Sequence, residues 1–119
     1  MKICVPTLGK GGLDDRVNEH FGRAQTFTVV DTDTGEVGVI ENGGEHICGL
    51  GNAPQKVAQM RAQIVLCSGL GPKALTLLRS QRIDVYVGAK GTVKEAVDLW
   101  KAGKLRLATM DEACKDHKH

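Results

Sequence analysis

The first third of the chain alternates short apolar runs with turn residues, a pattern typical of strands. Residues 2–6 (Lys-Ile-Cys-Val-Pro) predict a short buried strand that Pro6 ends. Residues 26–31 are rich in β-branched and aromatic side chains and predict a second strand. Residues 36–41 predict a third strand. Because residues 33–35 (Asp-Thr-Gly) between them are a turn signal, we expect these two strands to form a hairpin.

Beyond residue 53 the pattern changes to helices that alternate with strands. Helical spacing of apolar residues after a proline predicts a helix over residues 54–63, and a second helix begins at Pro72. Residues 64–67 are a continuous apolar run, which is typical of a strand buried on both faces. Residues 83–87 predict a further strand of the same kind.

A capping box at residues 92–95 (Thr-Val-Lys-Glu) predicts the start of a third helix, which Gly103 ends. The order of elements is then βββαβαβα, which predicts an α/β domain with a mixed five-stranded sheet flanked by helices. We expect this domain to span residues 1–105. Residues 106–119 predict a polar tail that contains cysteine and histidine, although the alternation over residues 104–110 leaves room for a short extended segment.

Composition narrows the class of protein. A chain of 119 residues and 12.8 kDa fits one domain. No apolar run approaches the roughly 18 residues of a membrane-spanning helix, and the apolar N-terminal stretch is too short for a signal peptide, so we expect a cytoplasmic protein. A net charge of +2, with one Trp, one Tyr and two Phe, argues against a nucleic-acid partner. The four cysteines include no CxxC pair, which argues against a zinc ribbon or a thioredoxin-type motif.

The predicted topology gathers the chemically useful residues at one edge of the sheet. Ligands of such sheets bind beyond the carboxyl ends of the parallel strands. The loops at residues 6–12, 67–72 and 88–92 follow those ends, and all three are rich in glycine. The antiparallel second strand begins at this edge and the third strand ends there. This rim collects side chains that can bind metals or anions: His20, Arg23, His46, Cys48 and Cys67.

The rim predicts a site for an anion with soft character. Helix N-termini and bare backbone N–H groups favour negative charge, and Arg23 adds a fixed cation. Thiolate and imidazole ligands suit iron, copper, zinc and metal–sulfur clusters. A phosphate would meet only the first demand, whereas an anionic metal–sulfur cluster would meet both. Two of the rim loops contain a glycine turn that opens a helix, at residues 68–71 and 88–91. Neither glycine turn matches GxxxxGK[ST] or GxGxxG, so a nucleotide site is weakly supported.

Two sets of residues follow from this interpretation. The residues predicted to contact the cofactor are His20, Arg23, Gly69, Gly71 and Gly91. The candidate metal ligands are His20, His46, Cys48, Cys67, Cys114 and His117.

Several short motifs also occur in an order that resembles a known family. They are residues 20–23 (His-Phe-Gly-Arg), 66–71 (Leu-Cys-Ser-Gly-Leu-Gly) and 88–96 (Gly-Ala-Lys-Gly-Thr-Val-Lys-Glu-Ala), with the start at residues 1–3 and the hairpin. Over roughly residues 1–105 the chain resembles the dinitrogenase iron–molybdenum cofactor biosynthesis family.

This resemblance implies a ribonuclease H-like three-layer fold. The family includes nitrogenase cofactor carriers, small stand-alone proteins of anaerobes, and an orange protein of sulfate reducers that holds a molybdenum–copper sulfide cluster. For single residues the resemblance implies only that His20 is a candidate cofactor ligand.

Each candidate has a structural alternative. His20 could instead cap the next turn, and Arg23 could pair with a loop carboxylate. Cys4 lies between Ile3 and Val5 and is interpreted as a core residue. Core packing is also the favoured interpretation of Cys67, although it lies at the rim.

The remaining candidates lie in polar segments. Cys48 is either a ligand beside His46 or a free surface thiol. The tail residues Cys114, His117 and His119 either bind metal transiently or belong to a solubilising tail.

Three functions compete. The leading hypothesis is a non-enzymatic carrier or scaffold for an anionic metal–sulfur cluster that contains iron, molybdenum or both, as the resemblance implies. It would serve cofactor assembly or storage in the manner of a nitrogenase accessory protein. The second is a regulatory or protein-interaction module of anaerobic metabolism without a stable cluster, whose partners would be cofactor-assembly or regulatory proteins. The third is a nuclease, which would need clustered carboxylates to hold two metal ions. The first strand offers Ile3, Cys4 and Val5 instead, so the enzyme ranks lowest.

Overall fold

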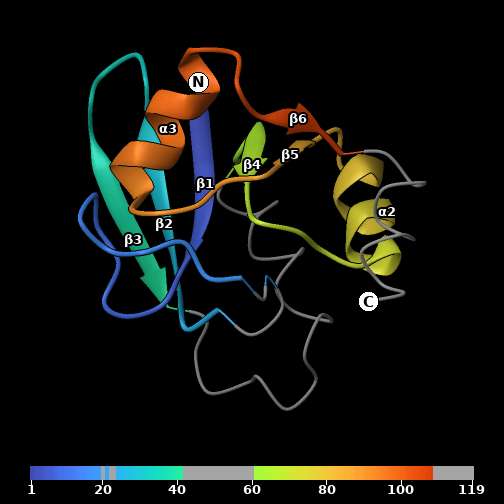
Figure 1. Cartoon of the computed structure of the whole chain (residues 1–119), viewed down its shortest axis with the longest axis horizontal. Helices are drawn as coiled ribbons and strands as arrows, with labels where there is room; N and C mark the ends of the chain where they lie inside the picture. Colours follow the sequence, from blue (N-terminus) through green and yellow to red (C-terminus); the bar gives the residue numbers. More distant parts are fainter. Residues whose placement is uncertain (20, 22–23, 42–60, 109–119) are drawn as a thin grey trace.

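The computed structural model describes residues 1–19, 21, 24–41 and 61–108. Figure 1 shows a curved sheet with one helix in front of it and a second helix at its side. The elements in chain order are β1 (Lys2–Thr7), β2 (Thr26–Asp31), β3 (Val37–Glu41), β4 (Ile64–Leu66), α2 (Pro72–Ser80), β5 (Asp84–Val87), α3 (Val93–Lys101) and β6 (Arg106–Leu107). The hairpin, the strand before Pro72 and the two helices that follow are confirmed.

The sheet is mixed, and its strands lie in the order β3-β2-β1-β4-β5-β6. Strands β1, β4 and β5 are parallel to one another, whereas β2, β3 and β6 each run antiparallel to their neighbours. The predicted count of five strands is therefore wrong, because β6 adds a sixth. Gly103 reverses the chain after α3 with a φ of 73° and returns it to the free edge of β5.

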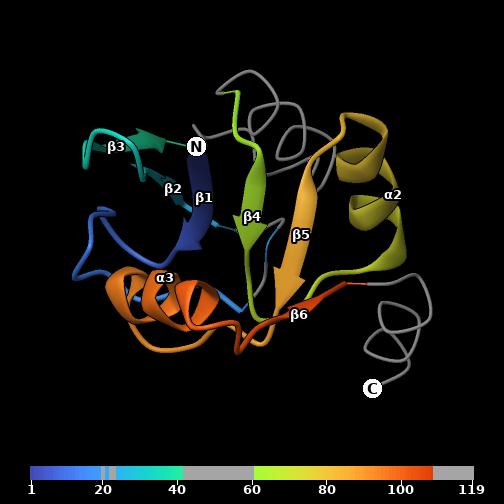
Figure 2. The same ribbon diagram turned by 90° about the horizontal axis from the view of Figure 1, so that it is seen from above.

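Alternating side chains of the central strands build a separate core on each face of the sheet. Cys4 and Val65 pack on one face with the buried side chains of α2, whereas Ile3 and Ile64 pack on the other with those of α3. The two described helices therefore cover opposite faces, in three layers (Figure 2). The apolar spacing predicted after Pro72 is confirmed, since Ala74, Leu75 and Leu78 are the buried residues of α2.

Several element ends differ from the prediction by one residue, and the end of β1 shows why. Pro6 does not end β1, which runs on to Thr7. The carbonyls of Lys2 and Pro6 both point toward the β4 side, where they accept from the backbone N–H groups of Gln63 and Asn18. Pairing with β4 covers only Ile3 and Cys4, so the proline ring removes no hydrogen bond from the sheet.

Most of the helix predicted over residues 54–63 lies outside the described residues, and its last three residues form a turn that leads into β4. The predicted domain boundary at residue 105 falls directly before β6. The backbone N–H of Ala108 still donates to the carbonyl of Val85 at 2.7 Å, so the sheet edge extends past that boundary. The finer assignment to a ribonuclease H-like fold stays a prediction.

Candidate functional site

The carboxyl ends of β1, β4 and β5 open onto one rim. The turn after β4 is bonded to the turn after β5: the hydroxyl of Ser68 donates to the carbonyl of Ala89 at 2.7 Å, and the N–H of Gly88 donates to the carbonyl of Ser68 at 3.3 Å. On the other side, the N–H of Val17 donates to the carbonyl of Gly91 at 2.9 Å. Three segments that are far apart in the sequence thus form one connected edge.

Asp15 organises the glycine-rich loop after β1. Its carboxylate accepts from the backbone N–H groups of Gly9 at 2.9 Å, Gly11 at 2.7 Å and Arg16 at 2.7 Å. Burial acts to raise the pKa of Asp15, but these three hydrogen bonds outweigh it and hold the pKa below its usual value. Sequence reasoning missed this role, although a carboxylate that follows several glycines is the signal that could have shown it.

Three buried threonines fasten the same loop to the sheet. The hydroxyl of Thr26 donates to the carbonyl of Gly9 at 2.7 Å, and the N–H of Gly12 donates to the hydroxyl of Thr28 at 3.0 Å. Thr7 joins them by donating to the carbonyl of Thr26 at 3.0 Å. All three hydroxyl groups are therefore hydrogen-bonded within the protein. This pairing allows three polar side chains to be buried in the core.

The N-terminal end of α3 is closed by protein groups. The N–H groups of Val93 and Lys94 donate to the carbonyls of Asp15 at 2.9 Å and Leu13 at 3.0 Å. The N–H of Glu95 donates to the hydroxyl of Thr92 at 3.2 Å, and the Glu95 carboxylate accepts from the N–H of Thr92 at 3.0 Å, as the capping box predicts. Every donor of the first turn has a partner, so this end offers none to a ligand.

Gly91 has a structural role at this closed end. Its φ is 82°, and a side chain there would place Cβ 2.7 Å from the carboxylate of Glu95. These contacts account for the glycine without a cofactor.

The N-terminal end of α2 is open. Its N-cap residue, Gly71, makes no side-chain cap, and Pro72 has no N–H. Within the part of the chain that the structure describes, the N–H groups of Lys73 and Ala74 have no partner. Gly71 has ordinary extended angles, with φ −75° and ψ 165°, and a Cβ there would meet nothing within 4 Å. Backbone geometry therefore does not require glycine, whereas close approach of a ligand would.

The two described cysteines are buried thiols. Cys4 is fully buried, as predicted, and burial together with the neighbouring Cys67 raises the pKa of its thiol. Cys67 is also fully buried, and its Sγ lies 3.8 Å from the carbonyl of Tyr86, to which it donates. Packing thus accounts for the position of Cys67, and a metal would reach its sulfur only if the surrounding side chains moved apart.

Among the other predicted site residues, the structure describes only Gly69. Gly69 is half-buried in the turn between β4 and α2. His20, Arg23, His46, Cys48, Cys114 and His117 lie outside the described residues, as does His119. The neighbours of His20 are anchored at the rim, because Asn18 is buried and its N–H donates to the carbonyl of Pro6, and because buried Phe21 packs 5.6 Å from the ring of Phe27. Among the described residues, no three His, Cys, Asp or Glu side chains are grouped to hold a metal ion.

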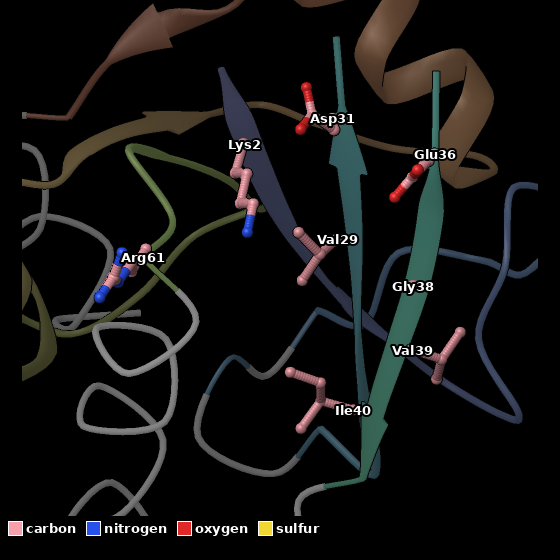
Figure 3. Close-up of a pocket in the computed structure, with 8 residues that line it drawn as sticks. All are labelled: Lys2, Val29, Asp31, Glu36, Gly38, Val39, Ile40 and Arg61. Carbon is pink, nitrogen blue, oxygen red and sulfur yellow. The ribbon is translucent and has the colours of Figure 1, made fainter. Parts of the chain in front are cut away.

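A separate hollow of about 590 Å³ lies over β2 and β3, away from the glycine turns (Figure 3). Lys2 and Arg61 line it on one side, and Val29 and Ile40 line it from β2 and β3. Asp31 and Glu36 also line it, so its charges are mixed and give no preference for an anion.

None of the described helices is long and apolar enough to cross a membrane.

Comparison with known proteins gives relatives along almost the whole chain. An uncharacterised protein of Methanocaldococcus jannaschii is 32% identical over 111 residues, which cover 88% of this chain and 89% of that protein. The apo form of the orange protein from Desulfovibrio gigas has a TM-score of 0.85 and 34% identity, and the match covers 91% of this chain and 92% of that one. A Thermotoga protein of the DUF35 family has a TM-score of 0.75 and 28% identity over 89% of this chain and 91% of its own.

The family described as dinitrogenase iron-molybdenum cofactor matches residues 1–103. This match takes in β1 to β5 and both described helices, and it covers the rim and the two glycine turns. The chain therefore belongs to the dinitrogenase iron-molybdenum cofactor family.

Proposed function

We propose that the chain is a non-enzymatic carrier or scaffold that takes an anionic metal–sulfur cluster, containing iron or molybdenum, as its cargo. The observation that carries this proposal is the open N-terminal end of α2, where the N–H groups of Lys73 and Ala74 have no partner among the described residues. Membership of the family and the likeness to the orange protein support the same assignment.

The open end suits an anion for two reasons. Unpaired N–H groups and the helix dipole attract negative charge, and among the described residues no atom lies within 4 Å of the position that a Cβ on Gly71 would take. The closed end of α3 has neither property, so we place the cargo at α2 and leave Gly91 outside the site.

The proposed donor set joins this backbone site to side chains on the neighbouring segments. His20 would supply a soft imidazole ligand and Arg23 a cation, while Gly69 and Gly71 would admit the cluster close to the backbone. His46, Cys48, Cys114 and His117 stay in the proposal as further ligands from other segments. Cys67 would join only if the side chains around it moved apart.

The first test is the metal and sulfide content of protein purified without oxygen, together with its visible absorption spectrum. Stoichiometric metal and sulfide with a visible band would support a carrier. Absence of both, in protein that also fails to take up a synthetic molybdenum–sulfide or iron–sulfide cluster, would favour the interaction module.

A charge-matched pair of variants then tests the location. Gly71→Asp adds a carboxylate and a side-chain cap at the open end, whereas Thr92→Asp adds the same charge at the closed end and keeps a capping oxygen. We expect Gly71→Asp to weaken cluster binding in an anaerobic titration by about tenfold or more while slightly stabilising α2. Thr92→Asp should bind like the parent. Equal affinities for both variants would place the cargo elsewhere.

A further inference from the structure

The outer edge of the sheet at β3 lacks most of the features that usually protect such an edge, although Glu41 gives the strand one charge. All five residues of β3 are exposed, and Val37, Val39 and Ile40 are apolar. Edge strands are commonly protected by short length, proline, lysine or a bulge. β3 contains neither proline nor lysine, and its pairing with β2 runs without a bulge from Glu41 to Val37. At the opposite edge, β6 has only two residues.

The hydrogen bonds of the hairpin fix which backbone groups point outward. The N–H of Asp31 donates to the carbonyl of Glu36, so the backbone of Glu36 faces β2. Successive residues of a strand direct their N–H and C=O groups to opposite edges, so Gly38 also faces β2 while Val37 and Val39 face away. Within the described residues, the outward groups of Val37 and Val39 have no hydrogen-bond partner.

We propose that β3 pairs with β3 of a second copy of this chain, antiparallel about a twofold axis at Gly38. In this register the outward N–H and C=O groups of Val37 bond to those of Val39 in the second copy, and the reverse pair repeats the contact. Two six-stranded sheets would then continue into each other across the β3 edges. This proposal concerns a surface away from the glycine turns and does not rest on cluster binding.

The side chains of β3 fit this register. Val37 and Val39 share one face of the strand, so each valine meets a valine of the second copy. Figure 3 shows Ile40 on the face of the hollow and Val39 pointing away from it. Gly38 meets Gly38 of the second copy in a non-hydrogen-bonded pair, where backbones approach closely, and a Cβ at Gly38 meets nothing within 4 Å in the single chain.

Charge placement also allows a second copy. Glu36 lies opposite Ile40 of the other chain, so the glutamates of the two copies do not face each other. A single pair of five-residue strands buries less than the roughly 1,000 Å² of a stable interface, so the dimer should be weak, with Kd in the range of about 0.1–1 mM.

Sedimentation equilibrium of the full chain, from about 10 μM to 1 mM, tests association. Val37→Glu adds a third acid to the edge, and Leu107→Glu is the matched control on β6, since Val37 is 40% exposed and Leu107 51%. We expect the parent and Leu107→Glu to dimerise alike and Val37→Glu to weaken the dimer at least tenfold. A parent that stays monomeric at 1 mM, or equal dimerisation of the two variants, would overturn the proposal.

Disulfide trapping tests the register. Non-hydrogen-bonded pairs bring Cα atoms to about 4.5 Å, which a disulfide can bridge. In a Cys48→Ser, Cys114→Ser background, Gly38→Cys should cross-link to a second copy at least tenfold faster than Leu107→Cys under mild oxidation at about 200 μM. An extended peptide partner, in place of a second copy, would leave the two rates equal, and that result also overturns the pairing proposed here.

Discussion

Helices α2 and α3 have the same length and the same position after a parallel strand, but the residues at the ends of α3 favour a helix end and those of α2 do not. Each has nine residues and follows a parallel strand and a glycine-containing turn. α3 begins with a capping box and ends at Gly103, which supplies the positive φ that its terminal turn needs. α2 begins without a side-chain cap, and the matching position at its end is Arg82, with φ 62°.

This difference indicates that the requirements of folding explain the residues of the turn before α3, but not the glycine at the N-cap of α2. At α3, each local choice agrees with the helix, and loop carbonyls take the remaining N–H groups. At α2, a glycine stands where a serine or aspartate would stabilise the helix, although its backbone angles suit any residue. Local rules are most often broken at functional positions, and this supports placing the cargo at α2 rather than at α3.

The largest effect on the closed end should come from Asp15→Ala. The substitution removes the acceptor of three backbone N–H groups and loosens the loop whose carbonyls close α3. Since the carboxylate is only half-buried, we expect a loss of about 1–2 kcal/mol in the free energy of unfolding, measured by urea denaturation with Trp100 fluorescence. Asp14→Ala, at an exposed neighbour, is the control and should change stability little. Equal losses in both variants would show that the carboxylate does not organise the loop.

A smaller difference should separate the two N-caps. Thr92→Ala deletes a side-chain hydrogen bond and half of the capping box and should cost about 1 kcal/mol, whereas Gly71→Ala deletes no side-chain hydrogen bond and should cost less, about 0.5 kcal/mol, because alanine is a poorer N-cap residue than glycine. Denaturation of the two variants under one set of conditions measures the contrast. If Gly71→Ala were the more damaging change, α2 would have to depend on an interaction of Gly71 that its present contacts do not reveal.

Local signals explain which parts of this comparison the sequence could predict. The capping box, Pro72 and the apolar run of β4 are encoded by neighbouring residues, and all three are confirmed. The alternation over residues 104–110 allows an extended segment there, but a strand of two residues such as β6 is too short for this pattern to establish a sixth strand.

The features that the sequence did not predict depend on distant contacts. The roles of Asp15 and the buried threonines arise only when the loop folds onto β2. Gly91 and Gly71 look alike in the sequence, since only the loop carbonyls and Glu95 distinguish a closed helix end from an open one. The proposed contributions of His20 and Arg23 stay predictions for the same reason, because a ligand role depends on which groups meet in space.

Lowering the pH should weaken the hydrogen bonds at the N-terminal end of α3 more than those of α2. Hydrogen bonds from the Thr92 backbone and side chain lower the pKa of Glu95, and the pKa of Asp15 is also lowered. A carboxylate with a lowered folded-state pKa stabilises the fold above its unfolded pKa, and that contribution is lost as the pH falls through the folded value. The loss should therefore begin near pH 4.5 and continue below 3.8, the ordinary values for Glu and Asp.

Hydrogen exchange measures this loss residue by residue. Between pH 5 and about 3, the amides of Val93, Lys94 and Glu95 should lose protection several-fold relative to Leu75 and Leu78 in α2, after correction for intrinsic rates. Uniform loss of protection in both helices would mean that acid unfolds the domain as a whole rather than the carboxylate-dependent end.

The last contrast concerns the C-terminal ends of the two helices. In α2 the N–H groups of Arg82 and Ile83 donate to the carbonyls of Arg79 at 2.9 Å and Leu78 at 3.1 Å. In α3 those of Gly103 and Lys104 donate to Trp100 at 3.0 Å and Leu99 at 2.9 Å. Both helices thus end in the same Schellman pattern, and only the residue in the left-handed position differs.

Exchanging that residue should change stability in opposite directions. Arg82→Gly relieves an unfavourable backbone conformation and should stabilise the domain by about 0.5 kcal/mol, because the greater freedom of glycine in the unfolded chain offsets part of the gain. Gly103→Arg should destabilise by about 1 kcal/mol, although a side chain there meets no other atom within 4 Å. Urea denaturation of both variants gives the signs. If Arg82→Gly lowered stability, the arginine side chain would be making a contact worth more than the conformational cost, and the end of α2 would have to be counted as locally favourable after all.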